Sequence, residues 1–375
     1  MNLRDNYEET GKTMPRFAEI CEDFSKNTKQ IKKIGINIQG LIRTELEKVK
    51  DKTPEGQIPF MAVNFMNIND FVYTNKVSDI FLSVTAPELK EDIEKIGMMF
   101  EINAYAYAIS ESAIKTLSRW SGVKGDYFIN DNSPLRNMYL LRALYNADPE
   151  QLINFVYRED SNGSKKIFGA FGEGHAIVPM RWIPLLVKEE GLSCQWWKIN
   201  HETTEIITVS TRQGDVLPGV RIINSNTGYS SFTIQAVLVN KINNSYIVID
   251  EAIKKNSKKT EYANLKDDIS KMKMLSKAFL DDMLESNVKI EKNQITKIIS
   301  DIILEMNIPR KWQGIIINDI QPFINKEEFS ISEYIQICID ILYVAEDYLD
   351  FQTLSDARKN MLKLIIEKIK TKLVA

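Results

Sequence analysis

The clearest alternation of apolar and polar positions lies in two runs on either side of a short polar segment. Residues 232–239 place one set of side chains on one face of a strand and the other set on the opposite face. Residues 219–223 form a second β-favouring run. Between them lies Asn224-Ser225-Asn226-Thr227-Gly228, in which an asparagine tolerates positive φ and glycine adopts it without steric cost. The pattern predicts an antiparallel hairpin whose polar segment projects at the loop tip.

Other short runs also favour β-strands. LSCQWWKIN at 192–200, EIITVST at 205–211 and SYIVIDEAI at 245–253 are separated by polar turns. Together with the hairpin they predict an antiparallel meander. Further strands are expected within residues 58–73 and 99–110, where apolar and aromatic residues dominate.

Much of the remaining chain has apolar residues at the spacing of an α-helix. Apolar residues recur every three or four positions within residues 15–52, which are rich in lysine, and Ser110 precedes a similar run that ends near Gly122. Residues 134–157 are expected to form one or two helices, and residues 180–191 another. From Lys258 to the end, four further runs have the same spacing.

These elements predict an α+β fold with a central antiparallel sheet, flanking helices and a C-terminal all-helical domain. We expect an N-terminal helical arm over residues 1–57, an α+β core with the meander over residues 58–256, and the helical domain over residues 257–375.

Composition narrows the class of protein. The 375 residues are 44% hydrophobic and 26% charged, which suits a globular chain with a large core. No apolar run of about 18 residues is present, and the first residues lack a secretory signal, so we expect neither a membrane span nor export. The three cysteines, Cys21, Cys194 and Cys338, are far apart and fit a reducing, cytoplasmic compartment.

Three segments carry a resemblance to a known family. They are SRWSGVKGDYF at 118–128, GSKKIFGAFGEGHAIVP at 163–179 and LPGVRIINSNTGYSSFTIQAVLV at 217–239. The chain resembles the phage- and plasmid-encoded family called domain of unknown function 932 over about residues 100–250. The matching positions are Gly122, Val123, Tyr127, Asn224, Ser225, Gly228, Ser230 and Ser231. The resemblance implies an α+β core and a phage or mobile-element protein in the cytoplasm of a bacterial host, with no assigned activity.

Residues suited to catalysis are few. The two histidines, His175 and His201, each have a neighbouring glutamate but no metal-binding or acid–base motif around them. Cys194 lies in a strand-like run, where cysteine usually behaves as a buried apolar residue. The glycines of GAFGEG do not have the spacing of a phosphate-binding loop. We therefore predict no catalytic residue, metal or cofactor, and an enzyme is the least favoured class.

Nucleic-acid binding is the favoured function. Basic residues beside the predicted sheet could hold phosphates, and aromatic residues between them could stack on unpaired bases. Because the net charge is −3, such binding requires a local patch. Arg221, Lys198 and Arg212 are the main expected phosphate ligands, with Trp197 or Tyr229 stacking. The full predicted set is Lys165, Lys166, Arg181, Trp197, Lys198, Arg212, Arg221 and Tyr229, with Asn224, Ser225, Gly228 and Ser230 as a loop motif.

Two other interpretations stay open. The aromatic residues could belong to the core and the cations could merely be solvated. Alternatively, the protein could be an interaction module for a host or anti-phage defence protein. The apolar stripes of the helical tail suit self-association or partner binding, so a homo-oligomer is expected under either binding function.

Overall fold

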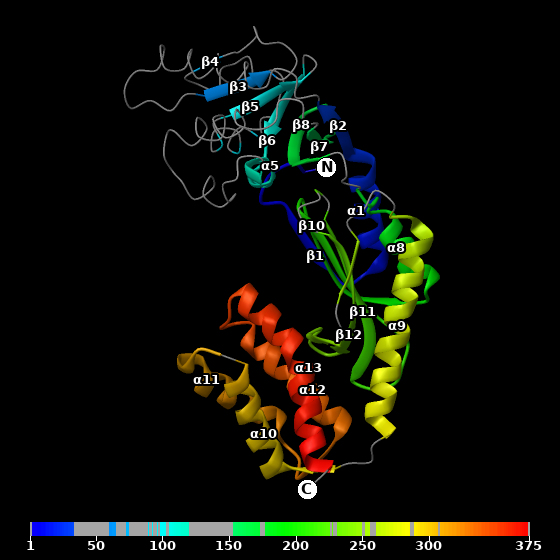
Figure 1. Ribbon diagram of the computed structural model, residues 1–375, viewed down its shortest axis with the longest axis vertical. Coiled ribbons are helices and arrows are strands. Elements are labelled where there is room, and N and C mark those ends of the chain that lie inside the picture. The colour runs from blue at the N-terminus through cyan, green and yellow to red at the C-terminus, as the bar shows by residue number, and fades with distance from the viewer. Residues whose placement is uncertain are drawn as a thin grey trace.

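A computed structural model describes most of the chain outside two long stretches near the N-terminal third. Figure 1 shows the described parts arranged along the long axis: a mixed sheet at one end, a large antiparallel sheet in the middle and helices at the other end. The predicted α+β architecture is confirmed. The described residues are 2–33, 60–64, 73–74, 89, 92, 96, 98–102, 105–119, 153–172, 177–225, 227, 231–249, 252–255, 260–285, 289–306 and 308–373.

The central sheet has the strand order β1-β9-β10-β11-β12-β13, with β14 also paired to β12. Every pairing in it is antiparallel, and β9 to β12 follow one another as the expected meander. Its strands are β1 (Glu8–Gly11), β9 (Ser193–Asn200), β10 (Thr203–Val209), β11 (Val216–Ser225), β12 (Phe232–Asn240), β13 (Tyr246–Val248) and β14 (Ile253–Lys255).

The hairpin predicted from the alternating pattern is formed by β11 and β12. Ile222 lies opposite Ile234, and Gly219 lies opposite Val237. The two faces differ as expected, because Ile234 packs in the core beneath the helices whereas Val237 belongs to a separate cluster on the other face. Of the segment between the strands, residues 226 and 228–230 lie outside the described residues.

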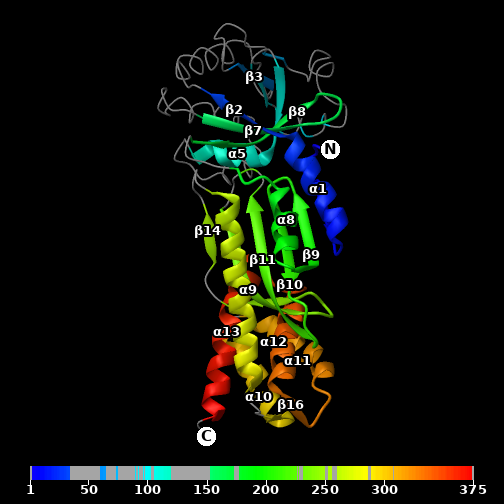
Figure 2. The same cartoon turned by 90° about the vertical axis from the view of Figure 1, so that its right-hand side faces the viewer.

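Three helices cover one face of this sheet. They are α1 (Met14–Asn27), α8 (Trp182–Glu189) and α9 (Tyr262–Glu285), and Figure 2 shows α8 and α9 in front of the strands. Phe17, Leu186 and Ile269, one from each helix, are fully buried in the shared core. The apolar stripe of each helix thus explains its place on the sheet.

The second sheet is mixed and has the order β2-β7-β8-β6-β5-β3-β4. The pairs β3–β5 and β6–β8 are parallel. Beside β8 packs α5 (Glu111–Ser118), whose first turn is capped as predicted, since the Ala113 amide donates to Ser110 Oγ at 3.0 Å. The strands are β2 (Thr28–Lys33), β3 (Phe60–Asn64), β4 (Tyr73–Thr74), β5 (Met98–Ile102), β6 (Tyr105–Ile109), β7 (Ile153–Glu159) and β8 (Lys165–Phe171).

Two helix predictions are wrong where this sheet forms. The helix expected over 15–52 ends at Asn27, and Thr28–Lys33 becomes an edge strand whose lysines suit an exposed edge. Ile153–Glu159, expected to end a helix, is a strand buried on both faces, so it shows no alternation in the sequence. The rest of residues 34–52, Gly122 and residues 134–152 lie outside the described residues.

The C-terminal segment is helical, as predicted, with one small ribbon added. Leu238 and Ile247 from the central sheet enter its core of isoleucine and leucine side chains. Ser330 and Glu333 form a capping box at the start of α12. The elements are β15 (Lys289–Glu291), α10 (Lys292–Glu305), α11 (Arg310–Ile320), η3 (Gln321–Phe323), β16 (Glu328–Ser330), α12 (Ile331–Ala345) and α13 (Phe351–Leu373), with β15 paired to β16.

The expected domain boundaries after residues 57 and 256 stay predictions. Strand β1 nevertheless pairs with β9, which joins the N-terminal residues to the central sheet. No helix in the described ranges combines the length and apolar character needed to cross a bilayer.

A buried carboxylate joins the helical domain to the sheet. Asp340 of α12 is 2% exposed, and its Oδ1 accepts hydrogen bonds from Nδ2 of Asn240 at 2.7 Å and of Asn243 at 2.6 Å. Burial raises the pKa of Asp340 to about 6, although the two amides act in the opposite direction. This contact between α12 and the sheet therefore makes Asp340 easier to protonate than an exposed aspartate.

We expect Asp340→Asn to raise the free energy of unfolding near neutral pH by about 1–3 kcal/mol. Because the pKa is higher in the folded chain than in the unfolded one, folding takes up a proton. The contribution of Asp340 to stability therefore falls as the pH rises from about 4 to about 6. The asparagine carries no charge, and its Oδ1 can still accept both hydrogen bonds. Urea unfolding at about pH 4.5 and pH 7.5 tests this; identical pH profiles for the two proteins would contradict it.

Candidate nucleic-acid interface

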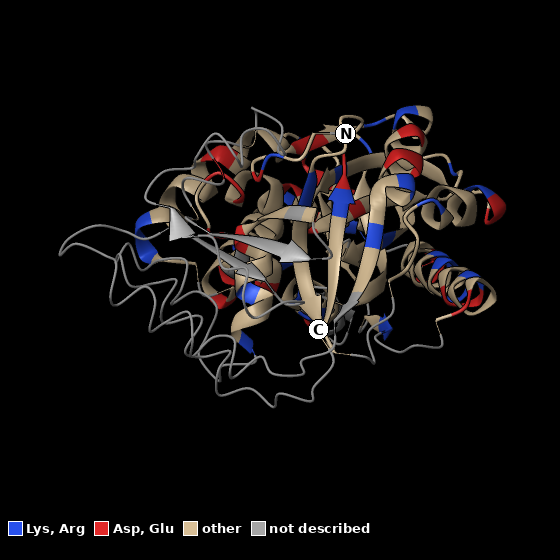
Figure 3. Cartoon of the chain, turned by 90° about the horizontal axis from the view of Figure 1, so that it is seen from above, with Lys and Arg blue, Asp and Glu red and all other residues tan. Residues whose placement is uncertain are grey.

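Most of the predicted phosphate ligands already have acidic partners. Lys198 Nζ lies 2.7 Å from Glu8 Oε2, and Lys165 Nζ lies 3.5 Å from Glu159 Oε1. Arg212 forms an ion pair with Asp281. Basic and acidic positions are interspersed over the described helices and strands rather than separated (Figure 3). The predicted basic patch is therefore largely neutralised.

Two predicted contact residues are buried, and their assignment is wrong. Lys166 is 0% exposed and lies between Asp5 and Asp92. Trp197 is 1% exposed; its Nε1 donates to the Thr13 carbonyl at 3.1 Å and its ring packs against Phe17. Neither side chain can reach a phosphate or a base from these positions.

The loop motif is also less accessible than expected. Asn224 is buried, and its Nδ2 donates to the Val178 carbonyl at 3.2 Å. Ser225 Oγ is buried as well and donates to the Glu202 carbonyl at 3.3 Å. Both residues fasten the end of β11 to neighbouring segments, so they do not project at a loop tip. Gly228, Ser230 and the predicted stacking residue Tyr229 lie outside the described residues.

Arg221 is placed on the sheet face opposite α1, α8 and α9. Its Nε donates to Glu205 Oε1 at 2.7 Å, and its Nη1 donates to Gln235 Oε1 at 2.7 Å. The guanidinium also lies 5.2 Å from the centre of the Tyr246 ring. These contacts fix the side chain and leave the rest of the guanidinium facing a groove.

This groove, here called the sheet–helix groove, lies between β11, β12 and α13 and has a volume of about 1030 Å³. Ile223, Leu362 and Ile366 contribute to its apolar walls. Four of its lining residues are cations and one is an acid: Arg221, Lys254, Lys359, Lys363 and Glu367.

The lysines of the sheet–helix groove are only weakly engaged. Lys359 Nζ lies 3.1 Å from Asp356, and Lys363 Nζ lies 3.9 Å from Glu367, both on the exposed face of α13. Lys254 forms no ion pair with any residue that the structure describes. Exposed pairs of this kind contribute only about 0.3–0.5 kcal/mol, so the lysines can change partners at little cost.

Trp196 is the aromatic residue that the sequence assignment missed. It lies opposite Ile207, which in turn lies opposite Arg221, so Trp196 and Arg221 share a face. It is partly exposed, unlike Trp197. Alternation along β9 indicated that the two tryptophans face opposite sides, but only the position of α1 decides which one is covered.

Arg181 lies away from this face. It is exposed at the start of α8, beside the helices that cover the other side of the sheet. The predicted set of residues therefore does not form one surface.

The residues considered for catalysis have no suitable surroundings. His201 stacks on Phe168 with ring centres 4.1 Å apart and contacts Arg158. Burial, with Arg158 and Lys166 nearby, holds the pKa of His201 well below its usual range. Burial raises the pKa of the Cys194 thiol to about 12, so the thiolate is scarce at neutral pH. His175 lies outside the described residues, and the described part of the chain contains no cluster of three or more potential metal ligands.

Comparison of the chain with protein-family models, with curated proteins and with solved structures finds no match. The residues and their geometry therefore carry the functional argument.

Proposed function

We propose that the chain is a non-catalytic accessory protein that binds single-stranded nucleic acid in the sheet–helix groove. The observation that carries this proposal is the charge of the groove, in which four cations and a single acid line a continuous cavity. Its origin in a phage or plasmid rests on the resemblance to domain of unknown function 932. Self-association of the chain is part of the same proposal.

Phosphates would lie along the lysines at the mouth of the groove. Lys254 is free of ion pairs in the described residues, and the helix pairs of Lys359 and Lys363 are exposed and weak. A phosphodiester chain can replace these acidic partners, because each phosphate offers a full negative charge to the lysine. Arg221 has a different role, since Glu205 and Gln235 hold it at the floor of the groove.

Bases would be held by apolar surface next to the lysines, to which Ile223 and Leu362 contribute. The partly exposed Trp196 lies outside the groove lining, two strands from β11 on the same sheet face. Sequence-tolerant binders of single strands combine a cationic groove with ring stacking, and Trp196 is the ring that this face offers for stacking. The proposal therefore predicts strong salt dependence and little preference among base sequences.

We expect charge reversal of the groove lysines to weaken binding at least tenfold. The variant combines Lys254→Glu, Lys359→Glu and Lys363→Glu, and the measurement is fluorescence anisotropy of labelled oligothymidylate at several salt concentrations. Losing three phosphate contacts should reduce the slope of log affinity against log salt by about 2. Labelled duplex DNA and RNA measured alongside would identify the preferred form.

A matched control reverses three other exposed lysines. Lys271 and Lys277 lie on α9 and Lys297 on α10, outside the groove lining. Changing these to glutamate alters net charge equally but should leave most of the affinity. Equal losses in the two variants, or no binding of any nucleic acid by the unaltered protein at micromolar concentration, would reject the proposal.

A further inference from the structure

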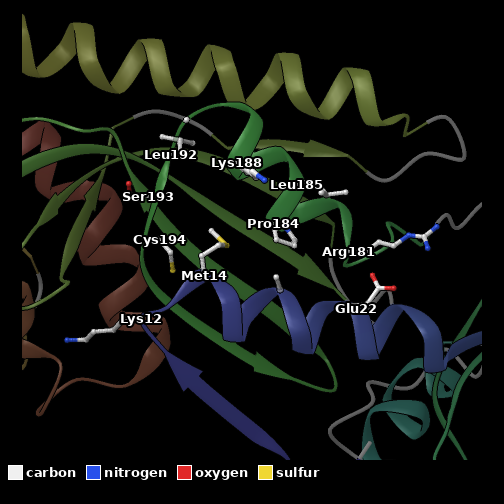
Figure 4. Close-up of a pocket in the computed structure, with 12 residues that line it drawn as sticks. Lys12, Met14, Glu22, Arg181, Pro184, Leu185, Lys188, Leu192, Ser193 and Cys194 are labelled. Atoms are coloured by element: carbon white, nitrogen blue, oxygen red, sulfur yellow. The ribbon is translucent and has the colours of Figure 1, made fainter.

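A second groove lies on the other side of the central sheet, between α1 and α8. It has a volume of about 890 Å³ and is here called the α1–α8 groove. Figure 4 shows Met14 of α1 and Pro184 of α8 in its central part, with Lys12 and Arg181 towards opposite ends. The groove thus combines an apolar middle with basic ends.

The basic residues of this groove have no acidic partner among the described residues. Lys12, Arg181 and Lys188 form no ion pair with any residue in the described ranges. Arg181 differs in this from Lys198, Arg212 and Arg221, which were also predicted to hold phosphates. The one acid in the lining, Glu22, has its own partner in Lys26 at 3.5 Å. The lining therefore holds three cations and one acid among its described residues.

Some apolar side chains of the groove remain exposed to solvent. Helix α8 buries Ile183, Leu186 and Val187 against the sheet, yet Leu185 is 50% exposed and lines the groove. Met14 is also partly exposed there. Leu185, Met14 and Pro184 therefore give the groove an accessible apolar middle.

The lining of the α1–α8 groove favours one kind of anionic partner. Its basic residues Lys12 and Arg181 lie towards opposite ends, with Met14 and Pro184 between them. Aliphatic side chains between basic ends complement a helix whose apolar stripe is flanked by aspartate or glutamate.

We propose that the α1–α8 groove binds an amphipathic, acidic helix of a partner protein. The apolar stripe of that helix lies on Met14, Pro184 and Leu185, and its acidic residues pair with Lys12, Arg181 and Lys188. This inference is independent of nucleic-acid binding, because the two grooves lie on opposite faces of the sheet.

The test uses a labelled helical peptide of about 18 residues, with leucines at helical spacing and glutamates flanking them. Anisotropy should report binding to the full chain in the micromolar range. A peptide with lysine in place of glutamate should bind at least tenfold more weakly. Cys194 gives a local readout, because it lines the groove and is partly exposed whereas Cys21 and Cys338 are buried. Bound acidic peptide should slow its alkylation several-fold.

Two groove variants and one control complete the experiment. Lys12→Glu with Arg181→Glu and Lys188→Glu should weaken peptide binding at least tenfold, and so should Leu185→Gln, an exposed position whose change should not disturb folding. The control with Lys271, Lys277 and Lys297 changed to glutamate should bind normally. Failure to bind the acidic peptide, binding without protection of Cys194, or protection by oligothymidylate instead would each overturn the inference. Protection by self-association, seen as a concentration-dependent mass without peptide, would also overturn it.

Discussion

Replacing Lys166 with methionine is expected to lower the free energy of unfolding by about 3–5 kcal/mol. The ammonium is fully buried, 2.9 Å from Asp5 Oδ1 and 2.7 Å from Asp92 Oδ2. Methionine fills a similar volume but leaves two neighbouring carboxylates without their cation. Burial already raises the pKa of Asp5 against the influence of Lys166, so the variant should recover part of its stability at acidic pH, where the carboxyls are protonated.

The adjacent lysine provides the control for this prediction. Lys165 occupies the next position of the same strand, but its ammonium pairs with Glu159 near the surface and lies over the Tyr105 ring. Lys165→Met should therefore lower the free energy of unfolding by about 1 kcal/mol or less. Urea unfolding of both variants at about pH 5 and pH 8 makes the comparison. Similar small losses in the two proteins would mean that Lys166 is not enclosed between the carboxylates.

Gly219→Ala is expected to lower the free energy of unfolding by about 3 kcal/mol. A Cβ atom at this position would lie 2.1 Å from the Thr208 carbonyl oxygen, on the neighbouring strand. Relief requires β10 and β11 to separate, which breaks hydrogen bonds in the middle of the central sheet. The backbone conformation of Gly219 is an ordinary one, so the effect comes from space alone.

A second glycine should respond in the opposite direction. Gly314 lies within α11, and a Cβ there would meet no atom within 4 Å. Because alanine favours a helix interior by about 1 kcal/mol over glycine, Gly314→Ala should raise stability slightly. Urea unfolding tests this: the denaturation midpoint should fall for Gly219→Ala and rise slightly for Gly314→Ala. A loss of less than about 1 kcal/mol at Gly219 would show that the strands are not so closely opposed.

The strands that were predicted correctly have polar positions or polar turns that mark them in the sequence. Strand β12 is buried on both faces, but Thr233 and Gln235 interrupt its apolar residues and a polar segment separates it from β11. Strand β7 is buried on both sides, and its continuous apolar run was assigned to a helix. Strand β2 has little apolar character, and among the described strands it pairs with β7.

The candidate site was harder to predict, because the sequence does not show which acidic residue pairs with a given lysine or arginine. Lys166 and Arg212 are cations of predicted strands or turns, but their acidic partners Asp92 and Asp281 lie 74 and 69 residues away in the sequence. Arg221 lines the sheet–helix groove, and the lysines of α13 that share this groove belong to the segment expected to serve self-association or partner binding. Long-range pairing thus decides which charges remain available to a ligand.

The contact between Trp197 and Thr13 has a consequence for how the chain folds during its synthesis. The two residues are 184 positions apart, and the strands beside them, β1 and β9, pair directly. At about 5–20 residues per second, the ribosome needs roughly 10–40 s to add the partner strand after the N-terminal strand has been made. During that interval the N-terminal strand has an unpaired edge, and α1 has no sheet on which to bury Phe17. Strand β1 and helix α1 therefore reach their native contacts long after they have been synthesised.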